Sequence, residues 1–258
     1  ARVLNDATFV QTGDIRLFAS VLHRQGLSGA SIRRNLSALR SFYNYLGRQD
    51  LAEHNPANGV QAPKQAKRLP KTLDADQVTN YLAATGDSPL ALRDQAIAEL
   101  FYSSGLRLSE LARLDVGDLD VANALVTVTG KGRKTRTVPV GSVALAALRD
   151  WLRVRPDIAG ENALFTSNRA RRISVRNIQA RLKLQGRKSG MHQDVHPHML
   201  RHSFASHMLE SSGDLRAVQE LLGHANISTT QIYTHLDFQH LAKVYDAAHP
   251  RAKKRKDS

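Results

Sequence analysis

The stretch from residue 55 to residue 71, NPANGVQAPKQAKRLPK, constrains the fold of this chain more than any other. Proline lacks an amide donor and clashes with a preceding helical turn, so Pro56, Pro63 and Pro70 interrupt any regular helix. No apolar period continues through the stretch. We interpret it as an extended basic linker that divides the chain into a small N-terminal part and a larger C-terminal part.

The N-terminal part is predicted to be helical over residues 12–25 and 28–46, where apolar residues recur at helical spacing. Gly47 follows the second helix as its predicted C-cap. Several arginines lie off the apolar stripe of that helix and face either solvent or a phosphate backbone, and the linker adds further cations that can follow such a backbone. The candidate DNA contacts here are Arg33, Arg34, Arg40, Lys64, Lys67 and Arg68.

The C-terminal part is predicted to be mainly α-helical with one small β-sheet. Helical periods cover residues 74–85, 89–102, 143–151 and 174–184, Ser109 is expected to cap a short helix, and Pro197 to begin another. Residues 124–140 change to strand-forming sequence on both sides of GKGRK, which predicts a β-hairpin with cations at its tip. A short strand is expected over 163–166. Arg133 and Lys134 at the tip, and Arg176 on a helix, are further candidate DNA contacts.

Charge and composition favour an anionic partner. The 37 Lys and Arg outnumber the 23 Asp and Glu, giving a formal net charge of +14, and nucleic acid is the first expectation for such a balance. The absence of cysteine excludes disulfides, iron–sulfur clusters and a cysteine nucleophile. No apolar run is long enough to span a membrane, and no signal peptide is apparent. The chain begins without Met, so we expect residues ahead of Ala1.

Histidines cluster between residues 195 and 237, which raises the question of a metal site. His198 and His202 are four apart, but HMLRH lacks the glutamate of the HExxH motif, and Arg201 would oppose a metal ion. The dense acidic group LDVGDLD, residues 114–120, is better interpreted as a turn before the hairpin than as a two-metal site. We therefore predict no metal.

A phosphodiester substrate accounts for the same residues better. Arginine offers a planar fork that fits two phosphate oxygens, and His198 and Arg201 are three apart on one helical face. Arg107 follows a helix-ending glycine and can reach the same phosphate, and His224 can donate another hydrogen bond. Lys131 can protonate a departing 5′ oxygen, and Tyr233 can act as the nucleophile. Each of these assignments is weak alone; only the combination favours catalysis.

The combination resembles the tyrosine recombinases. GLRLSEL (105–111), GKGRK (130–134), HPHMLRH (196–202), LLGH (221–224) and Tyr233 are similar to that family's Arg, Lys, His-x-x-Arg, His, Tyr series. The resemblance implies an active site formed by Arg107, Lys131, His198, Arg201, His224 and Tyr233, with no cofactor. It implies a helical core-binding domain joined to a mixed α+β catalytic domain, here residues 1–60 and 73–249, with a linker at 61–72 and a basic tail at 250–258. The first helix of the N-terminal domain is expected to be missing.

The family implies partners as well. Residues 211–253 are particularly similar to the bacterial branch that resolves chromosome dimers, which implies double-stranded DNA with a dif-like site and a heterotetramer with a XerD-type recombinase. It further implies an FtsK-type translocase as regulator, a last helix at 237–248 that docks into a neighbouring protomer, and a cytoplasmic, nucleoid-associated location. A non-catalytic DNA-binding protein and a type IB topoisomerase remain alternatives. The acceptor of the Tyr233 proton also stays open, with His198 as the candidate.

Overall fold

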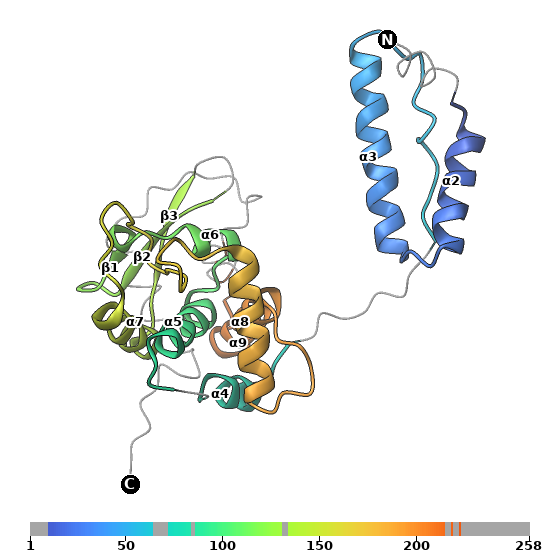
Figure 1. The fold of residues 1–258 in the computed structure, drawn as a ribbon. Coiled ribbons are helices and arrows are strands. Elements are labelled where there is room, and N and C mark those ends of the chain that lie inside the picture. Colours follow the sequence, from blue (N-terminus) through green and yellow to red (C-terminus); the bar gives the residue numbers. More distant parts are fainter. Residues whose placement is uncertain are drawn as a thin grey trace. The chain divides into compact units, whose positions relative to one another are not determined.

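The computed structural model describes residues 10–63, 72–83, 86–130 and 134–214, together with Val218 and Leu222. The chain divides into two compact units, residues 1–69 and residues 70–258 (Figure 1). Most of the predicted linker, residues 64–71, lies outside the described residues. Each unit is therefore treated by itself.

The N-terminal unit contains the two expected helices, α2 (Thr12–Arg24) and α3 (Gly29–Arg48). Ser28 caps α3 by accepting a hydrogen bond from the Ser31 amide at 3.2 Å, as the Ncap position favours. The predicted C-cap at Gly47 is wrong, because the helix continues through this glycine to Arg48. Buried apolar residues from both helices form a small core: Ile15, Ala19, Ile32 and Leu36, with Ala57 and Val60.

Ala57 and Val60 belong to the stretch that was interpreted as linker. Arg40 Nε donates to the Ala57 carbonyl at 3.1 Å, and Arg40 Nη2 donates to the Val60 carbonyl. The Asn55 side-chain amide donates in turn to the Arg40 carbonyl at 3.0 Å. The linker interpretation is therefore wrong for the beginning of the stretch, where α3 supplies hydrogen-bond partners and a core that sequence periodicity does not reveal.

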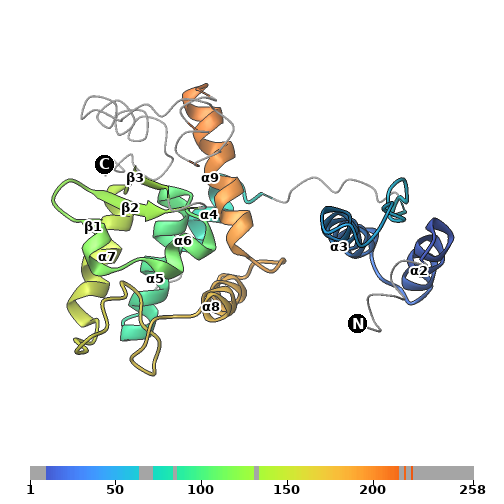
Figure 2. The same cartoon turned by 90° about the horizontal axis from the view of Figure 1, so that it is seen from above.

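The C-terminal unit is built around α5 (Pro89–Ser104), which packs against α7, α8 and α9 (Figures 1 and 2). Residues on every side of α5 are buried, as in a helix enclosed by its neighbours. Even Arg93 is buried, where Asp94 compensates its charge at 2.7 Å. The surrounding helices are α4 (Ala75–Ala83), α6 (Leu108–Arg113), α7 (Ser142–Val154), α8 (Val175–Lys188) and α9 (Pro197–Ser212).

The predicted hairpin is confirmed and extended to a three-stranded antiparallel sheet. Its strands are β1 (Leu119–Asp120), β2 (Leu125–Thr129) and β3 (Thr135–Pro139), in the order β1-β2-β3. The last register pair before the tip is Thr129 with Thr135. A short 3₁₀ helix, η1 (Val116–Asp118), leads into β1, which bears out the interpretation of LDVGDLD as a turn.

The expected strand over 163–166 is wrong. Asp115 pairs with Ala163 and Thr166 pairs with Arg172 only as isolated bridges, so no continuous ladder forms there. The described architecture is nevertheless the predicted class, mainly helical with one small sheet. Within the described ranges, no helix combines the length and the apolar composition needed to cross a bilayer.

Candidate active site

The chain turns sharply where α5 ends, and this turn brings the first candidate arginine to α9. Gly105 adopts a left-handed conformation, φ 55°, and its amide donates to the Phe101 carbonyl at 3.0 Å. A Cβ at this position would lie 2.4 Å from Cδ1 of Phe204, a residue of α9. Both the backbone angle and the close approach of α9 therefore require glycine here.

Arg107 is the N-cap residue of α6, so the predicted helix start at Ser109 is wrong. Its amide donates to Glu110 Oε2 at 2.8 Å and its guanidinium Nη1 donates to Glu110 Oε1 at 2.9 Å. The Arg107 side chain is 42% exposed, whereas that of Glu110 is 2% exposed. A buried carboxylate thus orients an arginine whose guanidinium still reaches solvent.

Glu110 is held from a second direction by the hairpin. Arg136 of β3 donates from Nη1 to Oε1 at 2.8 Å and from Nη2 to Oε2 at 3.0 Å, a bidentate pairing. Burial alone would raise the pKa of Glu110, but the hydrogen bonds from Arg136 and from the Arg107 amide outweigh it. Together they lower that pKa to about 2, so Glu110 is ionised at neutral pH.

Arg201, from α9, completes the cluster. Its Nη1 donates to the Gly105 carbonyl, and its Nη2 donates to the Leu222 carbonyl at 2.7 Å. Burial lowers the pKa of Arg201 to about 10, and the neighbouring charges of Arg107 and Arg136 act in the same direction, against Glu110. Arg107 and Arg201, far apart in sequence, are thus close enough to repel each other.

This arrangement suits an anion. Two guanidinium groups pair with the Glu110 carboxylate, and the charge of a third, that of Arg201, interacts with it, so the cluster keeps an excess of positive charge in a partly desolvated setting. Among the described residues, Arg201 donates to two carbonyls, and because a guanidinium offers five N–H groups, it has capacity to bind phosphate oxygens as well. A phosphate bound here would relieve the repulsion between Arg107 and Arg201.

The histidines of α9 separate into different environments. His198 is exposed and lies three residues before Arg201, so the two share a helical face as predicted. His196 instead caps α9, accepting from the Met199 amide at 3.2 Å, and burial, followed by the charges of His198 and His202, lowers its pKa. His207 is buried, and its Nδ1 lies 2.8 Å from the Tyr102 hydroxyl.

The remaining candidates are exposed, structural or outside the described residues. Arg33, Arg34, Lys134 and Arg176 are exposed, whereas Arg40 holds the N-terminal unit together and is a structural residue in this conformation. The structure does not describe Lys64, Lys67, Arg68, Lys131, Arg133, His224, Tyr233 or the expected last helix. Sequence reasoning missed Glu110 and Arg136; the only signal was the R-x-x-E spacing of Arg107 and Glu110.

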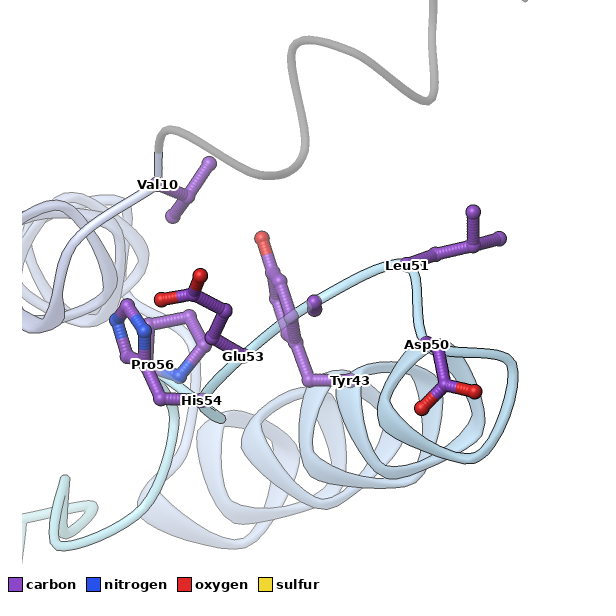
Figure 3. A pocket seen from close by; sticks show the side chains of 8 residues that line it. Val10, Tyr43, Asp50, Leu51, Glu53, His54 and Pro56 are labelled. Atoms are coloured by element: carbon purple, nitrogen blue, oxygen red, sulfur yellow. The ribbon is translucent and has the colours of Figure 1, made fainter.

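The structure offers no alternative phosphate site in the hollow of the N-terminal unit and no metal site among the described residues. A hollow of about 380 Å³ in the N-terminal unit is lined by Tyr43, Asp50, Glu53 and His54, among others (Figure 3). Its two carboxylates give it the wrong charge for a phosphate. In the part of the chain that the structure describes, no three His, Cys, Asp or Glu side chains gather as a metal site.

Comparison with known families identifies the chain. Residues 71–240 match the model of the phage integrase family, and residues 2–50 match the model of the phage integrase N-terminal SAM-like domain. The chain belongs to the phage integrase family. Members of this family that are 55–60% identical to the chain are named tyrosine recombinases, so this integrase-family chain is an enzyme of the class that transfers DNA strands.

The similar relatives cover nearly the whole chain. Tyrosine recombinase XerC of Alcanivorax borkumensis is 59% identical over 249 residues, which is 95% of this chain and 81% of that protein. Tyrosine recombinase XerC of Pseudomonas aeruginosa is 56% identical over 255 residues, 98% of this chain and 84% of that protein. The chain is therefore a site-specific tyrosine recombinase that resembles XerC, as the sequence motifs predicted.

Solved structures support the same family and fold. XerA recombinase is 30% identical with a TM-score of 0.58, over 97% of this chain and 90% of that one. XerH site-specific recombinase bound to a palindromic difH substrate has a TM-score of 0.72 at 24% identity, and the match covers 92% of this chain and 72% of that one. The second likeness is one of fold, and it confirms the predicted combination of a helical N-terminal domain and an α+β domain.

Proposed function

We propose that this recombinase cuts and rejoins strands of double-stranded DNA through a 3′-phosphotyrosine formed by Tyr233. The observation that carries the proposal is the arginine cluster. Arg107 and Arg201 meet at the Gly105 turn in a partly desolvated setting that favours an anion. A scissile phosphate develops negative charge on its non-bridging oxygens during displacement, and fixed guanidinium groups stabilise that charge.

The proposed reaction assigns a role to each of the six side chains. The Tyr233 hydroxyl oxygen attacks phosphorus, the P–O5′ bond breaks, and Lys131 protonates the departing 5′ oxygen. Arg107 and Arg201 bind the non-bridging oxygens, with His198 and His224 as further donors. The free 5′ hydroxyl of a partner strand then attacks the phosphotyrosine and restores the tyrosine. His198 is the candidate acceptor of the Tyr233 proton. The proposed reaction requires no cofactor.

The DNA path is proposed to follow the exposed cations of both units. Arg33 and Arg34 of α3, Lys134 at the hairpin and Arg176 near the start of α8 are exposed. Lys64, Lys67, Arg68 and Arg133 are proposed contacts on the sequence alone. We propose residues 1–60 as the core-binding domain, 61–72 as the linker, 73–249 as the catalytic domain and 250–258 as a basic tail.

The partners follow from the XerC-named relatives. We propose a heterotetramer with a XerD-type recombinase on dif-like sites, resolving chromosome dimers under an FtsK-type translocase. In it the helix at 237–248 would dock into a neighbouring protomer. The expected location is the nucleoid in the cytoplasm. The support is identity of 55–60% to proteins named XerC over most of the chain.

The test is a covalent adduct. The substrate is a duplex with a dif-like site that carries a nick next to the scissile phosphate. After cleavage, the short fragment with the free 5′ hydroxyl dissociates, so religation cannot occur and the covalent adduct accumulates. A denaturing gel then detects the adduct. The wild-type chain with its partner should give an adduct that maps to Tyr233. Tyr233→Phe should bind the duplex with unchanged affinity and give none. An adduct formed by Tyr233→Phe would disprove the assignment, and sequence-independent relaxation of supercoils by one protomer would favour a topoisomerase.

A further inference from the structure

Arg136 is not among the residues assigned to the reaction, yet it contacts the carboxylate that orients Arg107. The side chain of Arg136 is 15% exposed, and both of its terminal nitrogens donate to the carboxylate of Glu110, whose side chain is 2% exposed, at 2.8 and 3.0 Å. The same carboxylate holds the amide and the guanidinium of Arg107. Arg136, Glu110 and Arg107 therefore form one continuous chain of charged hydrogen bonds.

These hydrogen bonds join the start of α6, where Arg107 lies, to the hairpin whose loop sequence includes Lys131. Arg107 begins α6, whereas Arg136 lies on β3, one residue after the register pair Thr129–Thr135 that closes the hairpin. At the base of the tip, the Gly130 amide donates to the Lys134 carbonyl at 2.8 Å. A Cβ at Gly130 would lie 3.6 Å from Glu110 Oε1 and 3.8 Å from Arg136 Nη1. The ion pair thus lies against the base of the loop whose sequence includes Lys131.

We propose that Arg136 is a positioning residue for DNA cleavage, one that fixes Glu110 and thereby holds Arg107 and the base of the hairpin tip in one geometry. The proposal rests on the proposed function for its effect on rate. Arg136 acts through Glu110 and not on the phosphate.

The charges favour this role. Without Arg136, the buried Glu110 would lose the bidentate pairing that contributes most to offsetting its burial. Glu110 would then shift or protonate, and Arg107 would lose its orientation. A misplacement of about 1 Å at a reacting centre can cost roughly a hundredfold in rate. Substrate affinity depends on many phosphate contacts, so it should change far less.

The experiment compares Arg136→Gln and Arg136→Lys with Thr137→Val in the full chain and its XerD-type partner. Thr137 is the next residue of β3, and its hydroxyl pairs with that of Thr127 at 3.2 Å, away from Glu110. Single-turnover adduct formation on the nicked duplex, DNA affinity and the melting temperature are measured for each. Arg136→Gln should lose about a hundredfold in adduct rate with affinity within about threefold. Arg136→Lys should restore part of the rate, and Thr137→Val should leave it unchanged.

Two outcomes would overturn the proposal: an unchanged adduct rate in Arg136→Gln, or a loss that Thr137→Val reproduces at the same drop in melting temperature. A second measurement does not depend on activity. In protein labelled with ¹⁵N-arginine, the Arg107 guanidinium, assigned by Arg107→Lys, should show slow rotation that Arg136→Gln abolishes. Unchanged rotation would also overturn the proposal. Absence of any adduct from the wild-type chain would instead count against the proposed function, and the NMR result would still decide the role of Arg136.

Discussion

Arg40 in the N-terminal unit and Arg201 in the C-terminal unit make the same kind of contact, yet they have different consequences. Each guanidinium donates to two main-chain carbonyls from other segments, those of Ala57 and Val60 for Arg40, and those of Gly105 and Leu222 for Arg201. In both units an arginine of one helix donates to backbone carbonyls of other segments. Hydrogen bonding to the backbone therefore does not by itself distinguish a structural arginine from a catalytic one.

The distinction lies in the neighbouring charge. Burial and the nearby charge of Arg107 lower the pKa of Arg201 to about 10, which means that its positive charge is held at an electrostatic cost. A bound anion removes that cost. The contacts of Arg40 lie within a small apolar core. We therefore expect the second cation, and not the hydrogen-bond pattern, to distinguish the proposed phosphate site.

The largest expected effect separates these two arginines directly. Arg201→Ala should lower the single-turnover rate of adduct formation by between about a hundredfold and a thousandfold, because one preorganised donor to the developing charge is lost. Arg40→Ala should leave the rate on pre-bound DNA unchanged. Because Arg201→Ala also removes two structural contacts, Arg201→Lys keeps the charge as a control and should recover only part of the rate. Undiminished cleavage by Arg201→Ala would contradict its role.

The next effect tests the turn that brings Arg107 to α9. Gly105→Ala would place a Cβ 2.4 Å from Phe204 at φ 55°, which combines overpacking with a left-handed backbone. We expect a loss of about 2–4 kcal/mol in the free energy of unfolding of the C-terminal unit. Gly213→Ala is the matched control, since Gly213 has φ 66° and no atom of the described residues would lie within 4 Å of its Cβ.

Gly213→Ala should cost only the backbone term, about 1–2 kcal/mol. Denaturant unfolding measures both variants, and the difference between them is the packing contribution of Phe204. Equal losses would show that α9 moves away readily at Gly105, and the rigid placement of Arg201 beside Arg107 would then be in doubt.

Gly105 also shows which parts of the fold can be predicted from the sequence. The glycine after α5 was predicted as a helix stop, because left-handed C-caps favour glycine. Its contact with Phe204 could not be predicted, since it depends on how α9 packs against α5. Helices α2, α3, α5 and α7 and the hairpin were predicted from periodicity alone, because their apolar spacing is unbroken. Their ends were less certain: Gly47 lies within its helix, and Arg107 replaces Ser109 as a cap.

The candidate site divides in the same way. The motif residues Arg107, His198 and Arg201 could be selected by residue type and spacing, and the structure places Arg107 and Arg201 together. Glu110 and Arg136 could not be selected in this way, because neither residue type is unusual in its own segment and the ion pair between them forms only in the folded unit. Arg40 was selected as a phosphate contact because it lies off the apolar stripe of its helix, and that contact stays a prediction. The stripe could not reveal that residues 57–60 fold over the helix and accept hydrogen bonds from this side chain.

A smaller effect is expected for Arg40. Arg40→Ala removes two charge-assisted hydrogen bonds and leaves the carbonyls of Ala57 and Val60 without this donor. We expect a loss of about 2 kcal/mol in the stability of the N-terminal unit. The unfolding transition of that unit, followed by tyrosine fluorescence or hydrogen exchange, provides the measurement. Unchanged stability together with a large loss of DNA affinity would make Arg40 a DNA contact after all.

The smallest effect belongs to the exposed arginines of the same helix. If about six phosphates are contacted, the wild-type affinity for a dif-like duplex should fall roughly a thousandfold between about 50 and 200 mM salt. Arg33→Gln with Arg34→Gln should weaken binding by about 1 kcal/mol in total and lower the slope of log affinity against log salt by about two. Stability should stay within about 0.5 kcal/mol, because both side chains are exposed. An unchanged slope would remove Arg33 and Arg34 of α3 from the proposed DNA path.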